Sequence, residues 1–337
     1  MKSDSKQSAN TLGDWAKIAL EKHFQKTIQY EEDVLSDRDP EALHQMRVGM
    51  RRLRSAAKGF APALDLPKAA RHSQIGKISR SLGSLRDLDV LLETLETDYD
   101  QDALPEVEKE AFKRAIILLK SERNQAFDAV KETLNSEIYF SFKNSLADWL
   151  NNPTYGEMAL LPIQDILPDL LLPEVSDLFL HPGWLLGIKT KKGKVKIQNL
   201  TETEVEELFA NQGETLHDLR KQVKRVRYQM SLFKKFYGEA YSEYVEDLQE
   251  IQEVLGKMQD SVVLAETLAR VLGCNLQETL PTLAEKLLEN RYLSWLEWQP
   301  LHQKYLKPEI RDQFRLELLY PYSSSKSKKA PKKKKKD

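Results

Sequence analysis

The sequence predicts an all-α protein made of two similar lobes that are related by a pseudo-twofold internal repeat. Gly and Pro are scarce, with 13 and 14 in 337 residues, which argues against a β protein rich in turns. Apolar residues recur at helical spacing along most of the chain. Two long segments are also similar to each other. The single cysteine, Cys274, excludes a disulfide framework and a Cys-based zinc site.

The internal repeat is carried by a constant offset of 173 residues. HQMRVGMRRLRSAAKGF begins at His44, and HDLRKQVKRVRYQMSLF begins at His217. Without a gap, the same offset places Leu82-Gly83 on Leu255-Gly256, and Asp87 on Asp260. This period is far too long for a solenoid, so it predicts a duplication with two lobes.

The first lobe is expected over residues 12–150 and contains four helices. The second of these begins at Asp39-Pro40, where an N-cap residue precedes a proline in the first turn, and it ends before Ala61-Pro62. The fourth opens at Leu104-Pro105-Glu106 and is long enough to be broken. The expected helices cover residues 12–36, 39–60, 67–95 and 106–150.

A connector is expected over residues 151–211, because prolines and glycines interrupt the helical pattern there. Within it, residues 184–198 favour a small β-hairpin, and residues 201–211 favour a short acidic helix. The second lobe follows over 212–320. Its helices are expected at 216–237 and 241–272 and in a region 280–319 interrupted at Pro300 and Pro308.

The formal net charge of −1 hides a strong asymmetry. A tail over residues 321–337 holds eight lysines and is low in complexity, so we expect it to be disordered. Without those lysines and Asp337, the chain has 43 bases and 51 acids. Within this acidic body, residues 44–60 carry five Arg or Lys and no acid, and residues 217–235 carry seven against Asp218. Such local concentrations of positive charge indicate a specific anionic partner.

The cations of each segment fall on one side of a helix. At about 100° per residue, the first stripe lies opposite an apolar face that contains Met46, Met50 and Leu53, and the second copy repeats this arrangement. Like charges at this spacing destabilise a helix, and an extended polyanion with charges at similar spacing would offset that cost. A solvated face, or pairing with acids on neighbouring helices, is the structural alternative.

His44 and His217 align with the cations rather than with the apolar face, which favours contact with phosphate over a purely structural role at the helix start. No second His or carboxylate lies at ligand spacing on either stripe, so we expect no metal. Phosphotransfer through His44 lacks a Gly-rich phosphate loop, so we expect no cofactor and no enzymatic activity. Asp87 and Asp260 are expected to give structural support by orienting a neighbouring Arg or His.

With these motifs in place, the chain resembles the CHAD family, the conserved-histidine α-helical domain. The resemblance rests on the doubled H-x-x-R-x-x-x-[RK]-R-x-R pattern, followed by LGSLRDLDVLLETL and LGKMQDSVVLAETL. It implies two four-helix bundles about a pseudo-twofold axis and a shared basic surface that binds inorganic polyphosphate. Many relatives carry a CYTH triphosphatase domain with an E-x-E-x-K motif, whereas Glu202-Thr-Glu204-Val-Glu206 ends in Glu, so we expect a stand-alone module.

The same resemblance implies which residues bind the ligand. The matched positions are His44, Arg47, Arg51, Arg54, His217, Arg220, Lys224 and Arg227. Supporting cations are Arg52, Lys58 and Arg225, and further candidates are Arg80, Arg86, Lys221 and Lys234.

Two other function classes stay open. A nucleic-acid-binding protein is supported by the Lys-rich tail, but we see no aromatic residue placed among the cations to stack on bases. A phosphate-handling enzyme that uses His44 is the third hypothesis. The polar N-terminus predicts no signal peptide, and no apolar run is long enough to span a membrane. We therefore expect a cytoplasmic protein, associated with polyphosphate granules, whose protein partners the sequence does not reveal.

Overall fold

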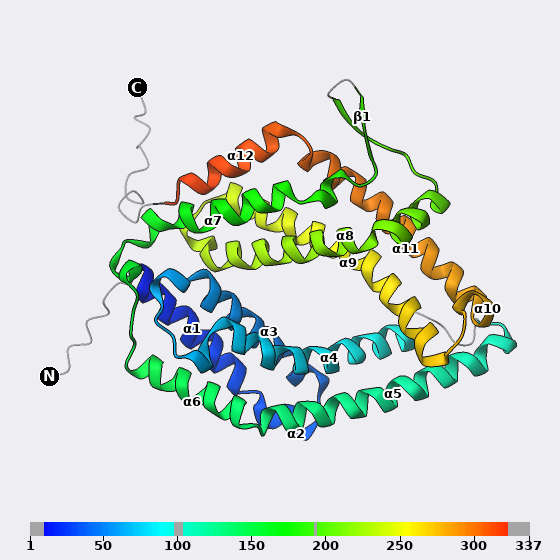
Figure 1. The fold of residues 1–337 in the computed structure, drawn as a ribbon, viewed down its shortest axis with the longest axis horizontal. Helices are drawn as coiled ribbons and strands as arrows, with labels where there is room; N and C mark the ends of the chain where they lie inside the picture. Colours follow the sequence, from blue (N-terminus) through cyan, green and yellow to red (C-terminus); the bar gives the residue numbers. More distant parts are fainter. Residues whose placement is uncertain (1–9, 98–103, 192–193, 323–337) are drawn as a thin grey trace, which may run out of the picture.

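A computed structural model describes residues 10–97, 104–191 and 194–322 of the chain. Within these ranges the protein is almost entirely helical, which confirms the predicted all-α class (Figure 1). The Lys-rich tail, with its expected disorder, lies outside the described residues. The longer helices are α1 (Leu12–Ile28), α3 (Pro40–Gly59), α4 (His72–Thr97), α5 (Glu106–Leu134), α6 (Glu137–Asn151), α7 (Ile163–Leu180), α8 (Glu202–Phe233), α9 (Glu239–Leu272), α11 (Pro281–Tyr305) and α12 (Pro308–Leu319), and the short ones are α2 (Glu31–Ser36) and α10 (Leu276–Thr279).

The start of α3 follows the local signals in the sequence. The Asp39 carboxylate accepts a hydrogen bond from the Glu41 amide at 2.9 Å, and Pro40 occupies the first turn. The preceding helix is shorter than predicted, because the chain turns after Ile28 and re-enters a helix at Glu31. The predicted break in the fourth helix is confirmed at the junction of α5 and α6.

The connector contains more helix than predicted. α7 runs through Pro168 and Pro173 and packs against α8. Its Leu167, Leu171 and Val175 side chains are fully or almost fully buried, and this burial offsets the hydrogen bonds that the two prolines remove. The expectation that prolines end helical structure here was therefore wrong.

The second half also has fewer breaks than predicted. α8 is one helix where the sequence favoured two, with Gly213 in its interior, and α11 continues through Pro300 before the chain breaks at Pro308. The predicted β-hairpin is confirmed. Its strands β1 (Ile188–Lys191) and β2 (Lys194–Ile197) are antiparallel, and Ile188 lies opposite Ile197.

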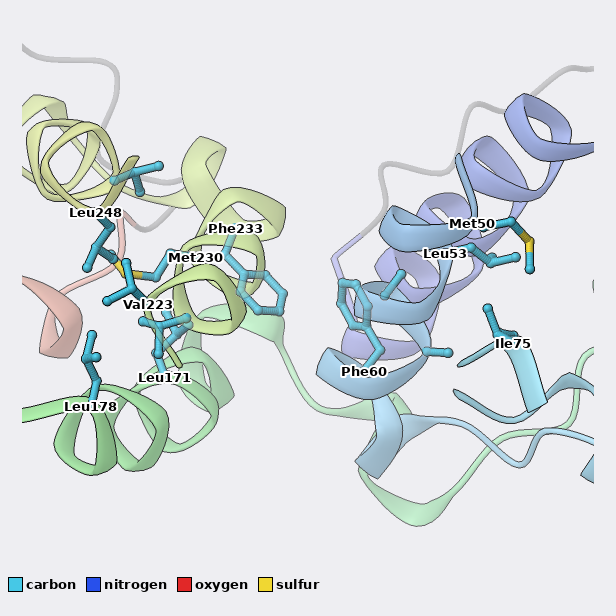
Figure 2. Packing of buried hydrophobic residues seen from close by; sticks show 14 of the residues in the cluster. Met50, Leu53, Phe60, Ile75, Leu171, Leu178, Val223, Met230, Phe233 and Leu248 are labelled. Atoms are coloured by element: carbon cyan, nitrogen blue, oxygen red, sulfur yellow. The ribbon is translucent and has the colours of Figure 1, made fainter. Parts of the chain in front are cut away.

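The helices form two groups that we call the N-terminal bundle (α1, α3, α4, α5 and α6) and the C-terminal bundle (α7, α8, α9, α11 and α12). The bundles contact each other where α3 meets α8 and where α5 meets α9 (Figure 1). At the first contact, Phe60 packs edge-on against Phe233 with ring centroids 5.2 Å apart, between the two cores (Figure 2). At the second, Leu119 and Leu268 belong to one buried cluster. These two contacts hold α3 and α8 opposite each other.

None of the described helices is long and apolar enough to cross a bilayer.

Candidate functional site

The apolar faces of α3 and α8 determine where their basic faces point. Met46, Met50 and Leu53 of α3 are completely buried in the N-terminal bundle, and Leu219 and Val223 of α8 are completely buried in the C-terminal bundle. The cations on the other side of each helix therefore lie between the bundles. We call the eight matched positions the interbundle site: His44, Arg47, Arg51, Arg54, His217, Arg220, Lys224 and Arg227.

The two stripes are close enough to repel each other. Burial lowers the pKa of Lys224 to about 8, and the positive charges of Arg51, Arg220 and Arg47 add to that effect. Arg47 and Arg51 belong to the opposite bundle, so their effect on Lys224 places α3 and α8 within electrostatic reach across the site.

Equivalent arginines make equivalent contacts in the two bundles. The Arg47 Nη1 donates to the Gly83 carbonyl oxygen at 2.6 Å and lies 3.0 Å from Asp87 Oδ1. In the C-terminal bundle, the Arg220 Nη2 lies 3.8 Å from Asp260 Oδ1. These contacts agree with the orienting role expected of both aspartates, which stays a prediction.

The recurring glycines make room for these arginines. A Cβ atom on Gly83 would lie 3.1 Å from Arg47 Nη1, and one on Gly256 would lie 3.2 Å from Arg220 Nη2. Each guanidinium group therefore occupies the space that a side chain would fill at a glycine of the neighbouring helix. The repeat of Leu-Gly in the sequence reflects this close approach of an arginine side chain.

Tyr228 joins the two stripes and was not predicted. The guanidinium carbons of Arg51 and Arg227 each lie 4.5 Å from the centroid of its ring. The statement that no aromatic side chain lies among the cations was therefore wrong. A stacking nucleic-acid base would have to compete with these guanidinium groups for the ring.

Several polar atoms of the site are buried without a partner. Among the described residues, Arg51 Nε, Arg220 Nε and His217 Nδ1 have no hydrogen-bond partner. An unsatisfied buried donor costs about 1–3 kcal/mol, so an acceptor that reaches these arginines would recover that cost. The site therefore favours a ligand rich in anionic oxygen atoms.

The pKa values of the two histidines of the site are lowered in the free protein. Burial lowers the pKa of His44, and Arg86 and Arg51 lower it further against the opposing effect of Glu41. Burial also lowers the pKa of His217, with Lys221 and Arg220 acting in the same direction. A bound polyanion would reverse these shifts by favouring the charged imidazolium.

The acids of the site are accessible to water but enclosed by protein. Enclosure between the bundles raises the pKa of Asp260, although its side chain is 72 % exposed, and Asp87 raises it further across the site. Both carboxylates thus approach the cations that a ligand would use.

No group of three or more His, Cys, Asp or Glu side chains in the described ranges is arranged to hold a metal ion.

The remaining predicted cations differ in how much of their charge is free. The Glu174 carboxylate lies 2.8 Å from Lys58 Nζ and 3.5 Å from Arg225 Nε. Lys221 pairs with Asp218 at 2.9 Å, and Lys234 lies 3.5 Å from Glu246.

The other three predicted cations have no ion-pair partner among the described residues. Arg52 is exposed, and the charge of Arg86 lowers the pKa of His44. Arg80 is exposed, and no contact of its side chain connects it with either stripe. Arg54 of the interbundle site lies over Gly76 of α4, 3.1 Å from where a Cβ atom would be.

A cavity of about 890 Å³ opens beside the site between α1, α3, α8 and the 3-10 turn η6 (Lys234–Phe236). Arg51 and Arg227 of the interbundle site line it. Lys22 and Lys235 also line it and were not predicted as site residues. Lys22 lies outside the repeat, and Lys235 belongs to the basic segment 217–235 but has no basic counterpart in the first copy, so only the fold brings the two together. We call this space the α1-side cavity.

Facing helices that carry Arg and Lys side chains from two bundles define a class of all-α proteins with cations between the bundles. The model of the CHAD domain matches residues 18–269, and the chain belongs to the CHAD family. Its fold is similar to the crystal structure of the CHAD domain from the plant Ricinus communis, with 23% identity, 92% of each chain covered and a TM-score of 0.53. It is also similar to PptA from Streptomyces chartreusis, with 16% identity, 88% of this chain and 100% of that chain covered, and a TM-score of 0.59. No curated protein matches.

Proposed function

We propose that this protein binds inorganic polyphosphate in the interbundle site and performs no chemical step on it. The observation that carries the proposal is the pair of facing cation stripes, with buried and unpaired N–H donors on Arg51 and Arg220. A linear polyanion reaches both stripes at once and supplies acceptors along its length. Arginine suits this ligand because its planar fork donates two hydrogen bonds to phosphate oxygens.

Membership of the CHAD family supports the same ligand, since the family resemblance implies polyphosphate binding. The contacts of Arg47 and Arg220 with Asp87 and Asp260 support it as well. Each aspartate is a largely exposed internal anion, so an external polyanion can compete with it for the arginine. We further propose a cytoplasmic location in association with polyphosphate granules.

Nucleic acid is the second candidate, and Tyr228 is the observation that favours it. Its ring offers a stacking surface, but two guanidinium groups already contact that ring. The third candidate, phosphotransfer through His44, is favoured only by the neutral state of the imidazole. Phosphohistidine at His44 after incubation with polyphosphate or nucleotide would support it.

A competition assay separates these candidates. The purified protein is loaded with fluorescent long-chain polyphosphate, and unlabelled polyphosphate, DNA and RNA are added at equal phosphate concentration over a salt series. We expect only polyphosphate to compete efficiently and the affinity to fall steeply with salt, because several contacts each release about one counterion. Affinity that does not change with salt, or equal displacement by DNA, would contradict the proposal.

A further inference from the structure

The α1-side cavity combines a high positive charge with an absence of acids. None of the described residues that line it is Asp or Glu. Its cations come from four separate elements of both bundles: Lys22, Arg51, Arg52, Arg227, Lys234 and Lys235. Of these, Lys234 shares its charge with Glu246, which lies 3.5 Å away and outside the lining. Such a concentration of like charge, held together by the fold, is costly for the free protein and favours a polyanionic ligand.

The corresponding region on the other side of the interbundle site lacks this charge. At the 173-residue offset, Ala61 and Pro62 stand in place of Lys234 and Lys235. Glu174 of α7 also neutralises part of the charge of Lys58 and Arg225 there. The unpaired positive charge around the interbundle site is therefore greater on the side of α1 than on the side of α7.

We propose that the α1-side cavity is an extension subsite, which holds the part of a polyphosphate chain that leaves the interbundle site and so selects long chains over short ones. This inference rests on the proposed function. The cavity shares Arg51 and Arg227 with the interbundle site, so a chain bound between the stripes passes into it without crossing a neutral surface.

Lys22 and Lys235 are the residues that distinguish this subsite from the interbundle site. Neither forms an ion pair with any residue in the described part of the chain, and Lys22 is exposed. The Lys235 ammonium lies 2.7 Å from the centroid of the Trp15 ring, which holds it at the edge of the cavity. Burial lowers the pKa of Lys235, and the charge of Lys22 lowers it further. A phosphate bound between the two ammonium groups would relieve this repulsion.

The test compares two double variants and two probes. Lys22→Gln with Lys235→Gln removes two charges from the subsite. The matched control, Lys196→Gln with Lys307→Gln, removes two charges from a separate cavity of about 860 Å³ between the hairpin and the end of α11. The probes are tripolyphosphate and polyphosphate of about 100 phosphates.

We expect the subsite variant to weaken binding of the long probe roughly tenfold at low salt and to reduce its salt slope by about two, while binding of tripolyphosphate changes less than about twofold. The control variant should leave both affinities within about twofold of the wild type. Equal losses for both probes, or equal losses in the control, would overturn the inference.

Trp15 gives a second, local readout. Movement of the Lys235 ammonium toward a phosphate changes the surroundings of the indole, so the long probe should change the fluorescence of Trp15 and tripolyphosphate should not. Trp15→Phe should remove that change. If the long probe binds the wild type without any signal that depends on Trp15, the subsite is not occupied. If the wild type binds neither probe, it is the proposed function that fails, so the two failures are distinguishable.

Discussion

The two sides of the interbundle site share one sequence pattern but differ in how much positive charge they leave unpaired. On the α1 side, Arg52 lies near His23, whose pKa is lowered to about 4 by burial and by Arg52, so the imidazole is neutral. On the α7 side, the equivalent Arg225 lies 3.5 Å from the carboxylate of Glu174. One arginine keeps its charge available for a ligand, and the other shares it with an acid of the protein.

Positions that recur between the two copies and positions that differ between them have separate effects on the charge of the site. Contacts that recur at the 173-residue offset, such as those of Arg47 and Arg220, determine that both bundles offer cations. Positions that differ at the same offset determine on which side of the interbundle site the positive charge continues. Two stripes with the same sequence pattern thus differ in the charge around them because a few positions outside the pattern differ.

The largest effect should come from removing both recurring arginines, which tests whether the two sides act together. We expect Arg47→Ala with Arg220→Ala to weaken polyphosphate binding by about 100-fold, and each single change to weaken it roughly tenfold, since one extended chain contacts both stripes. Isothermal titration measures the affinities, and circular dichroism checks helix content. A double variant that binds as well as Arg47→Ala would mean that only the N-terminal bundle is used.

Within the N-terminal bundle, arginine should matter more than histidine. Arg47→Ala with Arg54→Ala should weaken binding more than His44→Ala does, because the guanidinium is always charged whereas burial keeps the imidazole neutral near pH 7. The double variant and His44→Ala are compared by titration at pH 7 and at matched helix content. A larger loss from His44→Ala would point to a direct role of the imidazole in binding or in chemistry.

The next largest effect should be a dependence of polyphosphate binding on pH, which comes from Lys224. The free protein loses a proton from Lys224 near pH 8, and a bound polyanion favours the protonated ammonium. Binding should therefore weaken by up to about tenfold as the pH rises from 7 to 9. Lys224→Arg should remove this step, because arginine stays charged. The two histidines should strengthen binding further as the pH falls, because their pKa values are lowered in the free protein and a bound polyanion favours the imidazolium. An unchanged profile in Lys224→Arg would contradict the assignment.

A smaller effect should come from making the α7 side resemble the α1 side. Glu174→Gln removes the carboxylate that pairs with Lys58 and Arg225, so we expect about threefold tighter binding and a steeper salt dependence. Asp312→Asn is the control, because Asp312 pairs with Arg315 on α12 instead. If neither Glu174→Gln nor the Asp312→Asn control changes the affinity, Lys58 and Arg225 do not contact the ligand.

The smallest effect should come from the Lys-rich tail. The described chain ends at Tyr322, whose amide donates to the Phe236 carbonyl oxygen at 2.7 Å beside the α1-side cavity. Deleting residues 326–337 should slow association and weaken binding about twofold at low salt, because it removes eight lysine charges that attract a polyanion at a distance. Stopped-flow fluorescence measures the association rate. Complete loss of binding would instead favour nucleic-acid binding through the tail alone.

Local properties of the sequence determined the class of the fold and the identity of the two stripes. A helix repeats every 3.6 residues, so the spacing of His44, Arg47 and Arg51 places them on one face whatever surrounds the helix. Asp39-Pro40 likewise predicts the start of α3 from its immediate neighbours. The hairpin and the break before Pro308 follow from similarly local signals.

Tertiary structure decided which helices persist and which charges stay free. α7 continues through two prolines because its apolar side is buried against α8, and α8 continues through Gly213. Glu174 lies 116 residues from Lys58, and Lys22 lies 213 residues from Lys235, so no local pattern shows that the first pair binds and the second pair repels. Electrostatic energies depend on distance in space, and the packing of the two bundles alone sets those distances.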